Sequence, residues 1–343
     1  MPIYQFSKTV GLLRDIRAFL RIEVGATREN TPDDIRRKQS EDLKAARQTI
    51  KKTRRQLAQK EQQLNQLRTP TSAKGGSKTR GKAKSHIERG ALPDFLIIGA
   101  QKGGTTFLYW TLCQHPYVEP AAEKEIHFFD TPTFARGVDW YRTHFPPQQQ
   151  RNGRRVITGE ASPYYLFYPH AARRVAETIP QTKLIALLRD PVDRAYSDYQ
   201  HTLRQDHETL GFREALEAEE ERLRGEKEKI LADESYHSRS YRRYSYLSRG
   251  IYIDQLEEWH RYFDPEQLLI LKSEDFFARP SMTLELVLEF LGLPERDFEI
   301  GGEERNVGDY TEQMDPDTRH WLQEYYEPHN QRLYEYLGRD FGW

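Results

Sequence analysis

Short apolar runs alternate with amphipathic stretches from residue 92 onward. The runs predict strands, and they lie at 93–100, 156–158, 183–188 and 267–272. LIIG and LIALL, within the first and third runs, contain no polar residue, which is typical of parallel strands buried on both faces. Helical patterns lie between the strands at 105–115 and 253–263, and another follows the last strand at 282–292. The sequence therefore predicts an α/β domain with a central parallel sheet flanked by helices.

The first 68 residues carry helical patterns of a different kind. An apolar stripe over 7–22 predicts an amphipathic helix that either lies on a membrane or a partner, or packs on its own protein. Apolar residues then recur every seven positions, at Leu43, Ile50, Leu57 and Leu64. This spacing predicts a helix with a weak coiled-coil seam, which fits both self-association and a solitary solvated helix.

A change of composition separates this extension from the α/β domain. Residues 69–91 combine Pro, Gly and Ser with a run of Lys and Arg, and they offer almost nothing to bury. Such a composition is typical of a flexible basic linker. We therefore expect a helical extension over 1–68, a linker over 69–91 and the folded domain over 92–343.

Charge and cysteine content limit the partners and the compartment. Lys and Arg total 52 against 53 Asp and Glu, so no global positive field favours nucleic acid. The single cysteine, Cys113, excludes an intrachain disulfide and a Cys-rich zinc site. No apolar run approaches the roughly 20 residues that cross a bilayer, and no His/Asp cluster has metal-ligand spacing. We expect a cytoplasmic protein without a metal, with peripheral membrane contact as an alternative.

The first apolar run ends in a glycine-rich loop, GAQKGGTT, that leads into a helix. Gly103 and Gly104 let backbone N–H groups approach an anion, while Lys102, Thr105 and Thr106 offer a charge and two hydroxyls. In the nucleotide triphosphatase pattern, lysine follows the last glycine, whereas here it precedes the glycine pair. The loop predicts an anion site of another kind, and a turn without a ligand is the alternative reading.

A second candidate site follows the run at 183–188. Arg189 stands at the carboxyl end of this run, and Pro191 begins a helix that carries Ser197. A guanidinium fork suits a phosphate monoester, although Arg189 and Asp190 are also compatible with a strand-end ion pair. Because ligands of open α/β sheets gather at the carboxyl ends of strands, the glycine loop and Arg189 should face one crevice.

The segments GAQKGGTT and LRDPVDRAYSDY together resemble the sulfotransferases that use 3′-phosphoadenosine 5′-phosphosulfate (PAPS). Within that family the chain resembles the branch of the heparan sulfate sulfotransferase domains, over about 93–343. The resemblance implies a P-loop-like fold with PAPS as donor and the bisphosphate PAP as product. It also implies that Arg189 and Ser197 hold the 3′-phosphate. The 5′-phosphosulfate would be held by the loop residues Lys102, Gly103, Gly104, Thr105 and Thr106.

A third segment, AAEKEIHFFD, resembles the one that supplies the acceptor-site carboxylate in the glycosaminoglycan 3-O-sulfotransferases. The resemblance implies that Glu125 is the general base and that His127 orients or polarises it. Lys102 would stabilise the leaving phosphate, and the acceptor would be a hydroxyl or amine of a carbohydrate. Glu123 and Glu160 are competing carboxylates. Without the resemblance, a salt-bridged surface glutamate is the simpler reading of Glu125.

Two departures from that family and two other functions accompany this prediction. Golgi members close a loop over the nucleotide with a disulfide, whereas 301–317 has no cysteine, and Ala161 stands where relatives often have lysine. One alternative is an ATP-dependent phosphoryl-transfer enzyme that uses the glycine loop. The other is an inactive sulfotransferase-like protein that acts through its N-terminal helix.

Overall fold

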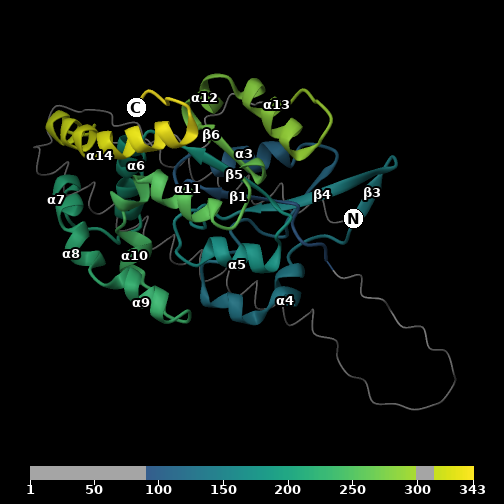
Figure 1. Cartoon of the computed structure of the whole chain (residues 1–343), viewed down its shortest axis with the longest axis horizontal. Coiled ribbons are helices and arrows are strands. Elements are labelled where there is room, and N and C mark those ends of the chain that lie inside the picture. Colours follow the sequence, from purple (N-terminus) through teal and green to yellow (C-terminus); the bar gives the residue numbers. More distant parts are fainter. Residues whose placement is uncertain (1–89, 299–312) are drawn as a thin grey trace, which may run out of the picture. The chain divides into compact units, whose positions relative to one another are not determined.

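The computed structural model describes residues 90–298 and 313–343, which all belong to the unit of the chain that spans 85–343 (Figure 1). The predicted extension over 1–68, its coiled-coil seam and the linker up to residue 89 lie outside the described residues. So does most of the 301–317 segment. The expected domain boundaries and the self-association therefore stay predictions.

A central sheet forms from the four predicted apolar runs and two further short strands. The predicted runs contain or overlap β1 (Phe95–Gly99), β4 (Arg154–Ala161), β5 (Lys183–Leu188) and β6 (Leu268–Lys272), whereas β2 (Val118–Pro120) and β3 (Gln149–Arg151) were not predicted. Within the described residues the strands follow the order β2–β4–β1–β5–β6, and β3 pairs with β4. Every pair along that order is parallel, and only β3 runs antiparallel to its neighbour. The prediction of a central parallel sheet is confirmed.

Helices cover both faces of the sheet (Figure 1). Alternate residues of β1 point to opposite faces. Leu96 and Ile98 pack with α5 (Ala171–Thr178) and α11 (Tyr252–His260), whereas Phe95 and Ile97 pack with α3 (Thr105–Leu112) and α13 (Pro280–Leu291). The helices are α3 (Thr105–Leu112), α4 (Val138–Arg142), α5 (Ala171–Thr178), α6 (Pro191–Arg204), α7 (Phe212–Glu217), α8 (Glu219–Leu223), α9 (Glu226–Ala232), α10 (Arg239–Arg243), α11 (Tyr252–His260), α12 (Ser273–Ala278), α13 (Pro280–Leu291) and α14 (Pro316–Leu337). The strands are therefore buried on both sides, as their apolar sequences require.

Several elements differ from the sequence-based expectation. The hairpin of β3 and β4 turns through Asn152 and Gly153, which both have positive φ and form the Asn-Gly signal of a two-residue hairpin. The charged stretch 212–234 forms three short helices, α7, α8 and α9; Ala218 lies between the first two, and Gly225, with φ 72°, precedes α9. The long α14 was not expected, and its buried residues include Leu322 and Tyr326.

Candidate active site

The glycine loop joins β1 to α3 and packs against the end of β5. The Ala100 N–H donates to the Leu187 carbonyl oxygen at 2.8 Å. A Cβ at Gly103 would lie 2.4 Å from the same carbonyl oxygen, so this position admits only glycine. Gly104 and Lys102 have φ values of 95° and 73°. The loop thus turns sharply and presents Lys102 and the start of α3 at the carboxyl end of β1.

The Lys102 side chain is half-buried beside α6. Burial lowers the pKa of its ammonium group and nearby arginines lower it further, whereas Asp198 raises it. Among residues 90–298 and 313–343 the ammonium group makes no hydrogen bond or ion pair. A cation in this setting has donors to offer to an anionic ligand.

Arg189 lies beside this loop, at the carboxyl end of β5. Its Nη1 donates to the Lys102 carbonyl oxygen at 3.2 Å, and Tyr252 Oη donates to the Arg189 carbonyl oxygen at 2.8 Å. The Asp190 side chain caps α6 by accepting a hydrogen bond from the Val192 N–H at 2.8 Å. Ser197 is buried in the second turn of that helix. The two predicted anion-binding segments are therefore neighbours.

A buried charge network that no sequence pattern indicated supports both segments. Asp198 accepts hydrogen bonds from Arg194 at 3.1 Å and from Arg249 at 3.3 Å, and all three side chains are buried. Arg249 also donates to the side chain of Gln101 in the glycine loop. Removing one partner of a buried ion pair typically destabilises a protein by about 3–5 kcal/mol. The network therefore holds the loop and α6 together.

The segment that carries the predicted base forms a turn with unusual backbone angles. Glu125 and His127 have φ values of 63° and 54°, which non-glycine residues seldom adopt. His127 Nδ1 lies 2.7 Å from Asp130 Oδ2, and its Nε2 lies 3.7 Å from Glu125 Oε2. Lys124 pairs with the other Glu125 oxygen. The turn thus brings Glu125 and His127 together and adds Asp130, which the sequence reading missed although it follows His127 by three residues.

Glu125 and His127 each shift the pKa of the other toward its charged form. The interaction with His127, together with Lys124, outweighs burial and lowers the pKa of Glu125 to about 2. Burial lowers the pKa of His127, but Asp130 and Glu125 outweigh it and raise the pKa to about 9. Arg242 Nη2 lies 3.1 Å from His127 Nε2. A neutral ring accepts a hydrogen bond from Arg242 at Nε2, whereas a protonated ring points an N–H toward Glu125.

The protonation of His127 predicts a pH dependence of stability. Its pKa is raised from an ordinary value of 6.5 to about 9. The stabilisation is therefore complete below pH 6.5 and is lost as the pH rises through about 9. We expect the free energy of unfolding to fall by roughly 1–3 kcal/mol over that interval. Urea denaturation at a series of pH values measures this fall. His127→Asn, which tolerates positive φ but does not titrate, should abolish it, and an equal fall in that variant would contradict the assignment.

His201 connects the two parts of the candidate site. It lies on α6, one helical turn beyond Ser197. Burial lowers the pKa of His201 and the charge of Lys102 lowers it further, whereas Glu125 raises it. The charges of Lys102 and Glu125 therefore both act on the His201 imidazole, which relates the donor loop to the turn of Glu125 electrostatically.

The competing carboxylates have other surroundings. Glu160 is fully buried and accepts hydrogen bonds from three hydroxyl groups, so it has no access to an acceptor. The Glu123 side chain is 63% exposed, and its Oε1 lies 3.2 Å from His144 Nε2. Glu125 is less exposed than Glu123, at 42%, and the histidine beside it, His127, is itself held by the buried carboxylate of Asp130.

Residues 92–336, most of the chain, match the family described as the sulfotransferase domain. The chain belongs to the sulfotransferase family. The expected family and the expected class of transferase enzyme are confirmed. The P-loop-like parallel sheet of the prediction agrees with the sulfotransferase domain, because a solved sulfotransferase from Alicyclobacillus acidocaldarius superposes on it with a TM-score of 0.58. That protein is 33% identical, and the match covers 73% of this chain and 98% of that one.

Two characterised sulfotransferases show similar levels of identity. Membrane-associated sulfotransferase kil1 of Dictyostelium discoideum is 28% identical, and the match covers 74% of this chain and 66% of that protein. Heparan sulfate glucosamine 3-O-sulfotransferase 3B1 of Mus musculus is 32% identical, with 74% of this chain and 65% of the relative covered. This sulfotransferase thus spans slightly less than two thirds of the length of these relatives.

The expected cytoplasmic location is wrong. The Dictyostelium relative is membrane-associated, and the mouse relative acts on heparan sulfate. The expectation rested on a single cysteine and on the lack of an apolar run long enough to span a bilayer. These features restrict disulfides and spanning helices, but they do not determine a compartment.

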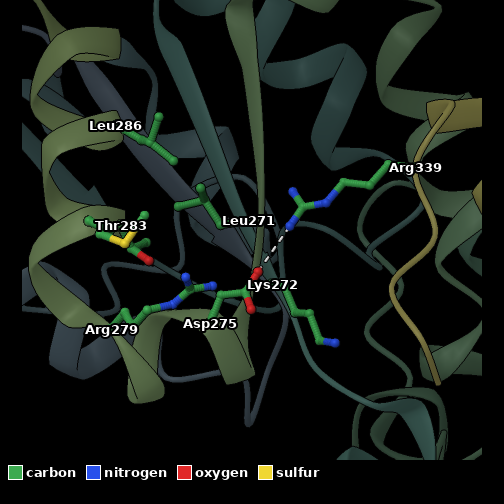
Figure 2. Close-up of a pocket in the computed structure, with 8 residues that line it drawn as sticks. Leu271, Lys272, Asp275, Arg279, Thr283, Leu286 and Arg339 are labelled. Carbon is green, nitrogen blue, oxygen red and sulfur yellow. Dashed lines mark hydrogen bonds and ion pairs between the residues drawn. The ribbon is translucent and has the colours of Figure 1, made fainter.

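The described residues meet the requirements of neither a metal site nor a membrane-spanning helix, but they do line a pocket. Within the described residues, no group of three or more His, Cys, Asp or Glu side chains is arranged to hold a metal ion. No helix in the same ranges is long and apolar enough to span a membrane. A pocket of about 90 Å³ lies between β6, α12 and α13, where Asp275 pairs with Arg339 at 3.0 Å (Figure 2). None of the predicted site residues lines this pocket.

Proposed function

We propose that this sulfotransferase transfers the sulfuryl group of PAPS to a hydroxyl or amine of a carbohydrate. The observation that carries the proposal is the contact between Arg189 and the Lys102 loop at the ends of the neighbouring strands β1 and β5. The relatives that act on heparan sulfate support a carbohydrate acceptor.

The donor would be held by its two separate phosphate groups. Lys102, the N–H groups of the loop and the hydroxyls of Thr105 and Thr106 suit the 5′-phosphosulfate. Arg189 and Ser197 suit the 3′-phosphate. Only one hydrogen bond from the Arg189 guanidinium, to the Lys102 carbonyl, is formed among the described residues, so its other donors can form a fork on a phosphate.

The reaction follows from the position of the charges. The acceptor oxygen or nitrogen forms a bond to sulfur while the bond between sulfur and the 5′-phosphate oxygen breaks. Glu125 takes the acceptor proton, and Lys102 with the loop N–H groups stabilises the negative charge on the leaving phosphate. Asp130 holds the His127 ring, which in turn lies against Glu125. The products are a sulfated acceptor and PAP.

Nucleotide binding tests the donor assignment. By calorimetry the protein should bind PAP more tightly than ATP with magnesium, because the two cationic segments match two separated phosphates. Arg189→Gln should weaken PAP binding about tenfold or more, since a hydrogen bond between charged groups is lost. Arg261→Gln is the control, because Arg261 is exposed and pairs only with Glu258 among the described residues.

Other binding results would favour the other functions. Tighter binding of ATP with magnesium than of PAP would favour phosphoryl transfer. Binding of neither nucleotide would favour an interaction protein. If PAP binds as proposed, incubation with labelled PAPS and a panel that includes heparan sulfate, neutral oligosaccharides and glycolipids identifies the acceptor.

A further inference from the structure

Glu160, near the carboxyl end of β4, is a fully buried carboxylate without a cationic partner among the described residues. Its Oε1 accepts hydrogen bonds from Tyr141 Oη at 2.5 Å and Tyr165 Oη at 3.0 Å. Its Oε2 accepts one from Ser162 Oγ at 2.7 Å. Burying a carboxylate without a counter-ion is costly, so these three hydroxyls are the compensation for its burial.

Two of the three hydroxyls also hold the turn that carries Glu125 and His127. Ser162 Oγ accepts a hydrogen bond from the His127 N–H at 3.3 Å, and Tyr165 Oη accepts one from the Phe128 N–H at 2.9 Å. Each hydroxyl has one proton to donate. Because Ser162 and Tyr165 each donate their hydrogen bond to Glu160, the lone pairs of both hydroxyls remain for the two amides.

The turn needs this support because of its backbone angles. Glu125 and His127 both have positive φ, a conformation that costs on the order of 1–3 kcal/mol at a non-glycine residue and persists only where the surroundings impose it. The two amides that Ser162 and Tyr165 hold belong to His127 and to the residue after it. The hydroxyls therefore restrain the turn at its strained position.

We propose that Glu160 is a positioning residue for sulfuryl transfer, which fixes the turn of Glu125 and His127 through the hydroxyls of Ser162 and Tyr165. The proposal rests on the proposed role of Glu125 as the base. Glu160 touches neither substrate, because it is fully buried. Its effect reaches the reaction only through the position of the Glu125 carboxylate.

Tyr141 provides a matched control. Its hydroxyl, like that of Tyr165, donates to Glu160 Oε1, but it makes no hydrogen bond to the turn among the described residues. Its ring stacks on Phe128 with centroids 4.5 Å apart, and a phenylalanine keeps that contact. Tyr141→Phe and Tyr165→Phe therefore remove the same group from the same carboxylate oxygen, and only the second releases an amide of the turn.

Steady-state kinetics separates positioning from simple core stability. We expect Tyr165→Phe and Ser162→Ala each to lower kcat about tenfold, since small displacements of a catalytic group have effects of this order. The KM for PAPS should change less than about twofold in both, because the donor loop is untouched. Tyr141→Phe should keep its kcat within about twofold of the wild type. Thermal melting and PAP affinity of each variant verify folding. If Tyr165→Phe does not fold, the kcat of Ser162→Ala tests the positioning role.

A double-mutant cycle tests the route of the effect. In a Glu125→Gln background the loss from Tyr165→Phe should disappear, because no base remains to be positioned. Equal losses of kcat in the two tyrosine variants, or a loss that persists without Glu125, would overturn the positioning role of Glu160. A wild-type protein that transfers no sulfuryl group from PAPS would instead overturn the proposed function.

Discussion

Glu125→Gln should lower kcat by about 10²- to 10⁴-fold, the range that a general base contributes. Glutamine has the same shape and can still accept a hydrogen bond from Lys124, but it cannot take the acceptor proton. The affinity for PAP should change less than about twofold, because the donor contacts lie on other elements. Single-turnover kinetics with labelled PAPS, together with calorimetry, measures the two quantities separately.

A neighbouring glutamate controls for the charge change. Glu123→Gln removes the same charge two residues away, from a carboxylate that is 63% exposed and faces His144, and it should leave kcat within about twofold of the wild type. Equal losses in the two variants, or a parallel loss of PAP affinity in Glu125→Gln, would contradict the role of base.

The pH profile gives a second test of this role. Because the pKa of Glu125 is lowered to about 2, its carboxylate stays ionised across the usual range of assays. Protonation of Glu125 should therefore not reduce kcat/KM at mildly acidic pH, and any loss there must come from another group. An acid limb that disappears in Glu125→Gln would show that its pKa is ordinary.

Lys102→Met should lower kcat by about 10²- to 10³-fold, the usual cost of removing one donor to a developing oxyanion. The methionine keeps most of the apolar stem at a position where φ is already positive, so the fold of the loop should survive. Affinity for PAP should fall as well, because the ammonium group would contact the 5′-phosphate of the product. Transfer rates with labelled PAPS and calorimetry with PAP measure the two effects.

An exposed lysine provides the comparison for Lys102. Lys227 lies on α9 and is exposed, and Lys227→Met should leave both quantities within about twofold of the wild type. Unchanged transfer by Lys102→Met would mean that the loop N–H groups alone stabilise the leaving phosphate. The proposed role of Lys102 would then be wrong.

The expected cytoplasmic location was the prediction that the sequence features did not suffice to support. One cysteine and the lack of a spanning run predict a cytoplasmic protein, and the similarity to a membrane-associated relative contradicts this prediction. By contrast, an available signal was overlooked in the β3–β4 hairpin, since Asn152 and Gly153 are the residue pair that favours such a turn.

The amino-acid sequence alone predicted β1, β4, β5 and β6, the glycine loop and the place of Arg189 at a strand end, but not the short β2 and β3. These features depend on runs of about five to ten neighbouring residues, whose apolar character and glycine content act locally. The tertiary fold alone shows which distant groups meet: Arg249 contacts Asp198 and Gln101, and the His127 and Phe128 amides contact the hydroxyls of Ser162 and Tyr165. These partners are 35 or more residues apart in the sequence. Their contacts arise only when the folded sheet brings the ends of its strands together, so no local pattern encodes them.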